Sequence, residues 1–96
     1  MQKPVGPFIV GLNKDAQKQF AALDKSVRER IKKRLEKLEI NHDVRTLVGR
    51  PDVWVSEIGD YRIYYLIDDA TKIKTVFFVG DHKEYEQRYK KMFWKR

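Results

Sequence analysis

Apolar and polar residues alternate through the middle of the chain in three runs that are rich in β-branched and aromatic side chains. A period of two is typical of β-strands, so these runs predict strands at residues 53–58, 61–67 and 73–79. Gly59 and Asp60 separate the first two runs. Because a two-residue turn of type II′ takes glycine at its first central position, the sequence predicts an antiparallel hairpin here.

The predicted turn pairs the two strands outward from the loop, as Ile58–Tyr61, Glu57–Arg62 and Val55–Tyr64. Side chains on a strand alternate between its faces, and one face collects a nearly apolar set that we expect to form the core. This set is Trp54, Ser56, Ile58, Tyr61, Ile63, Tyr65, Ile67, Ile73, Thr75, Phe77 and Val79. The other face carries Val53, Val55, Glu57, Arg62, Tyr64, Leu66, Lys74, Val76 and Phe78. Continuing the alternation past Gly80 brings His82 onto this second face.

The first quarter of the chain predicts a strand followed by a helix. A short apolar run at residues 8–12 is typical of a strand. Asn13 is a good N-cap, and Ala16, Phe20 and Leu23 follow it at the spacing of one helical face. We therefore expect a helix of about ten residues here, near the usual length.

A second helix is predicted from Ser26 and Glu29, whose spacing is that of a capping box. Its apolar stripe is Val27, Ile31, Leu35 and Leu38. Its remaining positions are crowded with basic residues, namely Arg28, Arg30, Lys32, Lys33, Arg34 and Lys37. This surface is either a solvated face with ion pairs such as Glu29–Lys33, or a contact for nucleic acid or an acidic protein.

Apolar side chains recur at helical spacing near the C-terminus and predict a helix at residues 83–95. They are Tyr85, Tyr89, Met92 and Phe93. The resulting order β-α-α-β-β-β-α predicts an α+β fold. We expect a small, mostly antiparallel four-stranded sheet with a two-helix hairpin on one face and a C-terminal helix. The length of 96 residues fits one domain that covers residues 1–96.

The composition narrows the classes of function. A net charge of +7 indicates a polyanionic or acidic partner, without choosing among DNA, RNA, the ribosome and a protein. The chain has no cysteine, which excludes a disulfide framework and thiolate chemistry. It has no long apolar run and no secretory signal, so we expect a soluble, cytoplasmic protein without a membrane partner. No carboxylate cluster has metal-ligand spacing, so we expect no metal and no cofactor.

Several motifs occur in the order of a known family. The connection before the first middle strand ends in Leu47-x-Gly49-x-Pro51-Asp52 and is followed by Trp54. The hairpin carries Gly59-Asp60-Tyr61-Arg62-Ile63-x-Tyr65, and the last strand ends in Val79-Gly80-x-His82-Lys83. Together with the basic second helix, these motifs cover nearly the whole chain. The chain resembles the RelE/ParE superfamily of type II toxin–antitoxin toxins.

The resemblance implies a small toxin that a cognate antitoxin neutralises. The RelE branch cleaves messenger RNA in the ribosomal A site, whereas the ParE branch inhibits DNA gyrase and is not a nuclease. Arg62 matches the arginine that the family carries after its Gly-Asp-Tyr turn. His82 stands where nuclease members carry an arginine or a histidine. The chain departs from the family where two basic residues are frequent, since it has Val55 and Glu57 there.

Cleavage of RNA by its own 2′-hydroxyl needs a base, an acid for the leaving oxygen and positive charge at the phosphate. His82 is the candidate acid or base, because imidazole exchanges protons near neutral pH. Arg62 can hold the phosphate through two hydrogen bonds. Glu57 is the candidate base, and Tyr85 a candidate for stacking or orientation. The candidate substrate-binding residues are Lys83, Arg50, Lys33, Arg34 and Lys37.

Structural roles remain open for the same residues. Glu57 opposite Arg62 also has the arrangement of a cross-strand ion pair. Asp81 is better explained as an N-cap, and His42 lies in a polar connection where we expect it to be exposed. Tyr85 and the aromatic residues after it are typical of a core, or of a surface that binds an antitoxin helix.

The sequence therefore predicts a RelE-like toxin that cleaves messenger RNA on the ribosome as a metal-independent endonuclease. Its expected partners are the ribosome, messenger RNA and a cognate antitoxin. Two alternatives stay open: a ParE-like toxin that inhibits gyrase, and an inactive basic module that binds nucleic acid. Replacing Arg62 or His82 leaves the toxicity of a gyrase inhibitor largely intact. A binding module shows affinity that falls steeply with salt and no cleavage.

Overall fold

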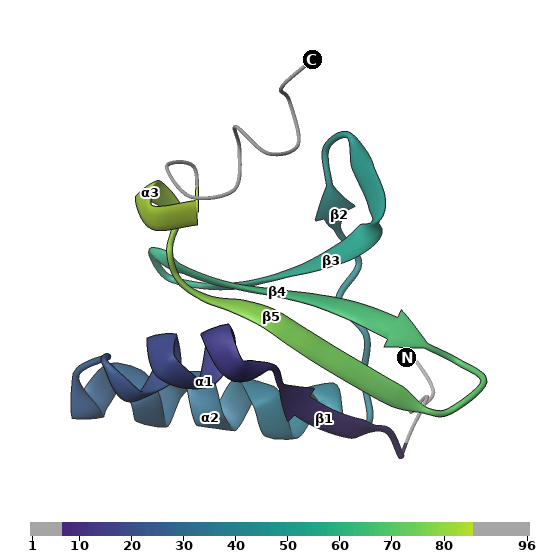
Figure 1. Ribbon diagram of the computed structural model, residues 1–96, viewed down its shortest axis with the longest axis horizontal. Helices are drawn as coiled ribbons and strands as arrows, with labels where there is room; N and C mark the ends of the chain where they lie inside the picture. The colour runs from purple at the N-terminus through teal and green to yellow at the C-terminus, as the bar shows by residue number, and fades with distance from the viewer. Residues whose placement is uncertain (1–6, 86–96) are drawn as a thin grey trace.

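The computed structural model describes residues 7–85, which form a sheet with two helices against one of its faces (Figure 1). In chain order the elements are β1 (Ile9–Leu12), α1 (Lys14–Ala21), α2 (Lys25–Leu38), β2 (Thr46–Leu47), β3 (Arg50–Ile58), β4 (Tyr61–Asp68), β5 (Ile73–Asp81) and α3 (His82–Tyr85). The strands lie in the order β1-β5-β4-β3-β2. β1 runs parallel to β5, and the other neighbours are antiparallel. We call the face turned away from α1 and α2 the distal face.

The predicted α+β class is confirmed, but the sheet has five strands among the described residues, where the sequence predicted four. The additional strand is β2, two residues in the polar connection, which pairs with the first half of β3. Gly49 forms the tight turn between them with a φ of 85°, a backbone conformation that glycine adopts without strain. The sheet is mixed because β1 joins it in parallel to β5.

The two N-terminal helices form where the sequence predicts them. The Asn13 side chain caps α1 as expected, accepting a hydrogen bond from the Ala16 backbone N–H at 2.9 Å. The predicted capping box of α2 is wrong: the helix begins at Lys25, with Asp24 at the N-cap and no side-chain hydrogen bond there. The apolar stripe is still the one that packs on the sheet, and Ile31 is fully buried.

The hairpin of β3 and β4 has the predicted register, with Glu57 opposite Arg62 and Val55 opposite Tyr64. Gly59 has a φ of 59°, as the turn requires. The conformation of this turn therefore places Glu57 and Arg62 together on the distal face.

The predicted faces of β5 are wrong in its first half. The pairing of β5 with β4 shifts between Tyr64 and Tyr65, so that Phe78 lies opposite Tyr64 and Val76 opposite Tyr65. The intervening Phe77 is the extra residue of a β-bulge, and an extra residue reverses the alternation on one side of it. Val76 and Lys74 consequently lie on the helix side and are buried, whereas the predicted core residues Ile73 and Thr75 are exposed. Val79, beyond the bulge, is buried as expected.

Each face of the sheet carries a hydrophobic cluster. The helix-side cluster joins Ala16, Val27, Ile31, Leu38, Ile58, Ile63, Tyr65, Val76 and Val79. The hydrophobic cluster on the distal face is smaller and consists of Val53, Val55, Tyr64 and Phe78, with Leu47 and Phe77 packed against it. The distal face is therefore apolar toward its middle, and its charged side chains gather at the end where the β3–β4 turn lies.

A charged group is buried on the helix side, where the sequence predicted only apolar packing. Lys74 has no exposed surface, and its Nζ donates hydrogen bonds of 2.6 Å to the carbonyl oxygens of Leu38 and Asn41. These carbonyls belong to the last turn of α2 and the segment after it, so Lys74 caps the C-terminal end of that helix. Burial lowers the pKa of Lys74 to about 8, against the opposing charges of Asp43 and Asp69.

The predicted C-terminal helix begins at His82 and is described for one turn, to Tyr85. The rest of that prediction, to residue 95, lies outside the described residues. None of the helices in residues 7–85 is long and apolar enough to cross a membrane.

Candidate functional site

Arg62 is fixed at the turn end of the distal face. Its Nη1 donates hydrogen bonds to the carbonyl oxygens of Gly59 and Tyr61, at 2.8 and 2.9 Å. Its Nε lies 3.9 Å from Oε2 of Glu57 on the neighbouring strand. The side chain is only 18% exposed, so the turn that positions the guanidinium also limits its movement.

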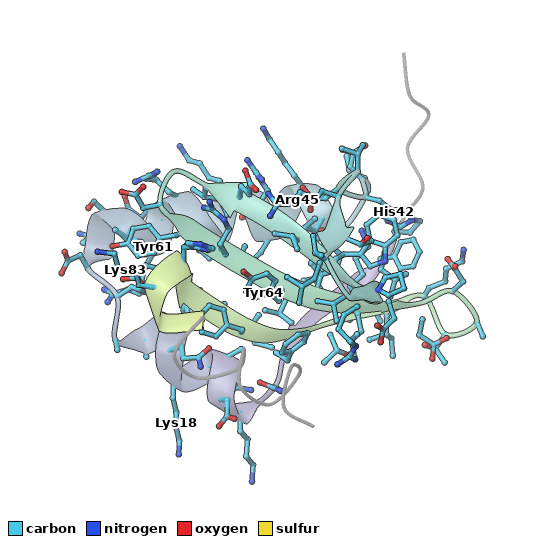
Figure 2. All side chains as sticks on the ribbon, turned by 90° about the horizontal axis from the view of Figure 1, so that it is seen from above. Lys18, His42, Arg45, Tyr61, Tyr64 and Lys83 are labelled. Atoms are coloured by element: carbon cyan, nitrogen blue, oxygen red, sulfur yellow. The ribbon has the colours of Figure 1, made fainter. Side chains whose placement is uncertain are left out.

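Arg45 reaches the same carboxylate from the other side of β3, and the sequence analysis missed it. Its Nη1 forms an ion pair with Oε2 of Glu57. Its carbonyl oxygen accepts a hydrogen bond of 3.0 Å from the Val55 backbone N–H, which holds this segment beside β3 just before β2 begins. The glycine at position 49 could have indicated this contact from the sequence, because a hairpin turn there aligns the residues before β2 with β3. In Figure 2 Arg45 lies over the β3 side of the sheet.

Glu57 thus lies between two guanidinium groups, and its side chain is 43% exposed. Two positive charges face one negative charge in this group, which we call the distal-face cluster: Arg45, Glu57 and Arg62. The structural alternative for Glu57, a cross-strand ion pair with Arg62, is present, and Arg45 adds a second pair.

His82 and Lys83 lie at the same end of the sheet. The His82 backbone N–H donates a hydrogen bond of 3.2 Å to the carbonyl oxygen of Asp60, in the β3–β4 turn. Gly80, two residues before His82, pairs with Arg62, so His82 begins α3 at the end of the sheet that carries Arg62. His82 and Lys83 are exposed, and Figure 2 shows Lys83 toward the end of the sheet where Tyr61 lies. The side chain of Tyr85 lies outside the part of the chain that is described.

The basic residues of α2 are not part of the distal-face cluster. Arg34 lies on the helix side, where its Nη1 donates hydrogen bonds to Ser56 Oγ at 2.7 Å and to the Glu57 carbonyl oxygen at 3.1 Å. Arg34 therefore ties α2 to β3. Lys33 and Lys37 are exposed on the same helix, on the opposite side of the sheet from Arg62.

Arg50 lies at the other end of β3, beside the β2–β3 turn. Its Nε and Nη2 donate hydrogen bonds to the two carboxylate oxygens of Asp52, at 3.1 and 3.0 Å. These bonds hold the pKa of the Asp52 carboxyl below its ordinary value. The predicted substrate-binding residues are thus spread over three regions, and only Lys83 lies near the end that carries Arg62 and His82.

His42 is half-buried, contrary to the expectation that it is exposed. Its ring lies 5.3 Å from that of Phe8 and 5.9 Å from that of Trp54, measured between centroids. Its Nδ1 is buried and has no hydrogen-bond partner among the described residues. Burial lowers the pKa of His42, and the charge of Lys74 lowers it further. His42 is therefore a largely neutral packing residue at neutral pH.

Chemically, the turn end of the distal face combines guanidinium groups, a carboxylate and an exposed imidazole. The guanidinium groups can bind a phosphate, and the imidazole and the carboxylate can exchange protons. Within residues 7–85, no three histidine, aspartate or glutamate side chains are grouped so that they could hold a metal ion.

Comparisons with known proteins agree with this architecture. A family model described as the ParE toxin of the type II toxin–antitoxin system parDE matches residues 10–85. Among curated protein sequences, no match to the chain is found.

Solved structures of RelE toxins have the same fold. The toxin in the intact E. coli RelBE toxin–antitoxin complex is 29% identical with a TM-score of 0.67, over 77% of this chain and 95% of that one. A doubly arginine-substituted E. coli RelE, bound to a peptide of the antitoxin RelB, is 28% identical with a TM-score of 0.70, over 84% and 92%. The archaeal RelE from the Pyrococcus horikoshii RelE–RelB complex is 23% identical with a TM-score of 0.66, over 78% and 94%, and supports the fold alone.

Proposed function

Since the chain belongs to the RelE/ParE superfamily of type II toxin–antitoxin toxins, we propose that it is a ribosome-dependent messenger RNA endonuclease of the RelE kind. The observation that carries this proposal is Arg62, a guanidinium fixed on the distal face at the end where His82 is exposed. A fixed guanidinium can stabilise the charge that develops on a scissile phosphate, and an exposed imidazole at the same end of the sheet can exchange protons with the reacting oxygens.

The proposed reaction uses the 2′-hydroxyl of the RNA as the nucleophile. The 2′-oxygen forms a bond to phosphorus while the bond from phosphorus to the 5′-oxygen breaks, which leaves a 2′,3′-cyclic phosphate. Glu57 takes the proton of the 2′-hydroxyl, and His82 in its imidazolium form gives a proton to the leaving 5′-oxygen. Arg62 stabilises the negative charge that develops on the phosphate oxygens.

The ion pairs of Glu57 affect its proposed role as the base. In the free protein its carboxylate oxygen Oε2 is in contact with Arg45 and lies 3.9 Å from Arg62. The two guanidinium groups favour the carboxylate over the carboxylic acid, so Glu57 accepts a proton more readily when at least one of these partners turns to another anion. The phosphate of the substrate is such an anion.

The test is cleavage of a translated message in vitro, mapped by primer extension with and without ribosomes. Wild type is expected to cut only in the presence of ribosomes. His82→Ala and Arg62→Ala are each expected to lower the rate at least about 100-fold, the usual size of an acid–base or charge-stabilising contribution. Lys18→Ala removes an exposed positive charge from α1, in the helix layer, and serves as the control with an unchanged rate (Figure 2).

Two results would contradict the proposal. Ribosome-dependent cuts that persist in both variants would move the chemistry away from Arg62 and His82. No cuts in wild type, with translation still inhibited, would exclude the nuclease.

Inhibition of gyrase is the second candidate, because the matching family model is that of the ParE toxin. This function predicts loss of DNA supercoiling by gyrase in the presence of the protein and full toxicity of Arg62→Ala. A supercoiling assay with wild type and Arg62→Ala distinguishes the two candidates directly.

A cognate antitoxin is the proposed protein partner, since relatives were crystallised in complex with the antitoxin RelB. The surplus of positive charge favours an acidic partner for this chain. We expect inhibition of cleavage when the antitoxin covers the basic surface.

A further inference from the structure

Arg45 and Arg62 approach one carboxylate oxygen from opposite sides of β3. Arg45 precedes β2 and forms an ion pair with Oε2 of Glu57 on β3. Arg62 belongs to β4, and its Nε lies 3.9 Å from the same oxygen. Each guanidinium has more donors than a shared carboxylate oxygen can use. An oxyanion between two guanidinium groups is also the arrangement in which arginine binds phosphate.

The two arginines differ in how firmly they are held. Arg62 is 18% exposed and is bonded to two carbonyl oxygens of its own turn. Arg45 is 53% exposed, and its ion pair is with Glu57. Its backbone is held independently, through the hydrogen bond from the Val55 N–H to its carbonyl oxygen. The Arg45 guanidinium can therefore turn to a new anion while the strand pairing stays intact.

We propose that Arg45 is a substrate-binding residue that exchanges the Glu57 carboxylate for a backbone phosphate of single-stranded RNA, beside Arg62. This inference rests on the proposed nuclease function and deepens it. Glu57 holds Arg45 over the distal face before substrate arrives. When phosphate draws Arg45 away, the carboxylate is left to accept a proton. Binding of the phosphate and release of the base are then the same event.

The first experiment measures binding without cleavage. The probe is a single-stranded RNA with 2′-O-methyl groups, which removes the nucleophile, and its affinity is followed by fluorescence anisotropy over a range of salt concentrations. Arg45→Gln is expected to weaken binding about tenfold. It is also expected to lower the slope of log K against log salt by about 0.7, the value for one phosphate contact with a single strand. Lys18→Gln is the charge-matched control, with an expected change of less than about twofold.

Glu57→Gln separates a substrate contact from a structural one. If Arg45 binds phosphate, Glu57→Gln removes the competing anion and RNA binding becomes tighter by about twofold to tenfold, at the scale of an exposed ion pair. Arg45→Lys keeps the charge without the planar guanidinium, and its affinity is expected to lie between those of wild type and Arg45→Gln.

Three results would overturn the inference. The first is an RNA affinity of Arg45→Gln equal to that of wild type. The second is an equal loss of RNA affinity in Lys18→Gln, and the third is a loss in Glu57→Gln as large as that in Arg45→Gln. The second result means a general effect of net charge, and the third means a structural ion pair.

Ribosome-dependent cleavage distinguishes failure of the role of Arg45 from failure of the proposed nuclease function. Cleavage by wild type that is unchanged in Arg45→Gln contradicts the role of Arg45 alone. Binding that follows the expected pattern, with no cleavage by wild type, contradicts the nuclease and supports Arg45.

Discussion

Two clusters, each with a basic and an acidic side chain, lie on the two faces of the sheet. The buried cluster consists of Lys74, Asp43 and Tyr65 on the helix side, and the distal-face cluster of Arg45, Glu57 and Arg62. Lys74 has no exposed surface, whereas Arg45 is 53% exposed. A buried charge is costly unless its donors are satisfied, while an exposed ion pair adds little to stability. A basic side chain is therefore part of the buried packing on one face of the sheet and stays exposed on the other.

The buried cluster connects three segments. Lys74 on β5 donates to the end of α2. The Tyr65 hydroxyl on β4 donates to Asp43 Oδ2 at 2.7 Å and accepts from the Asp43 backbone N–H at 3.1 Å. Burial raises the pKa of Tyr65 and lowers that of Lys74, so that the surroundings oppose charge on both groups. These contacts hold the segment that follows α2 against the sheet.

The largest expected effect comes from breaking the buried cluster. Lys74→Ala leaves two carbonyl oxygens without their donor and creates a cavity, so the free energy of unfolding is expected to fall by about 3–5 kcal/mol. Urea denaturation of wild type and Lys74→Ala measures this free energy of unfolding. Lys72→Ala, at an exposed position in the turn just before β5, is the control and should cost less than about 1 kcal/mol. A loss below about 1 kcal/mol for Lys74→Ala would show that the C-terminal end of α2 does not depend on Lys74.

A smaller loss is expected when only one hydrogen-bonding group is removed. Tyr65→Phe takes away the hydroxyl that donates to and accepts from Asp43, at an expected cost of about 1–2 kcal/mol. Tyr61→Phe, on the same face of the same strand, is the matched control, because its hydroxyl makes no hydrogen bond to the described part of the chain. Equal losses in the two variants would contradict a specific role for the bond to Asp43.

The lowered pKa of Lys74 makes stability depend on pH. Between the folded pKa of about 8 and the unfolded value of 10.5, the unfolded chain binds more protons than the folded one. Stability should therefore rise with pH in this window, by roughly 1.5 kcal/mol between about pH 8 and pH 9.5. A neutral amine still has two donors for its two carbonyl partners. Denaturation of wild type and Lys74→Met at several pH values tests this, and an equal slope in both would contradict it.

The smallest expected effect on stability comes from the distal-face cluster. Arg45→Gln should change the free energy of unfolding by less than about 0.5 kcal/mol, because the lost ion pair is exposed. The same variant is expected to weaken RNA binding, so its effects on stability and on function separate. A loss above about 1 kcal/mol would mean that Arg45 is structural, and would remove the contrast between the two faces.

The parts of the molecule that follow from short-range sequence signals were predicted well. The two-residue turn at Gly59 and Asp60 fixes the register of β3 and β4, which brings Glu57 and Arg62 together. The side chain of Asn13 forms the predicted cap of α1. The family could also be recognised from the motifs around these positions, and the match over residues 10–85 confirms it.

The tertiary structure decided what depends on contacts between distant segments. The bulge at Phe77 reverses half of β5 and buries Lys74, because only the packing of β5 between β4 and β1 selects where the extra residue lies. Arg45 reaches Glu57 because β2 pairs with β3, a contact too short to leave an alternating pattern. Sequence alone thus determined the hairpin, the two N-terminal helices and the family. Whether a charged side chain is buried or exposed depends on the assembled sheet, which buries Lys74 as a helix cap and leaves Arg45 exposed.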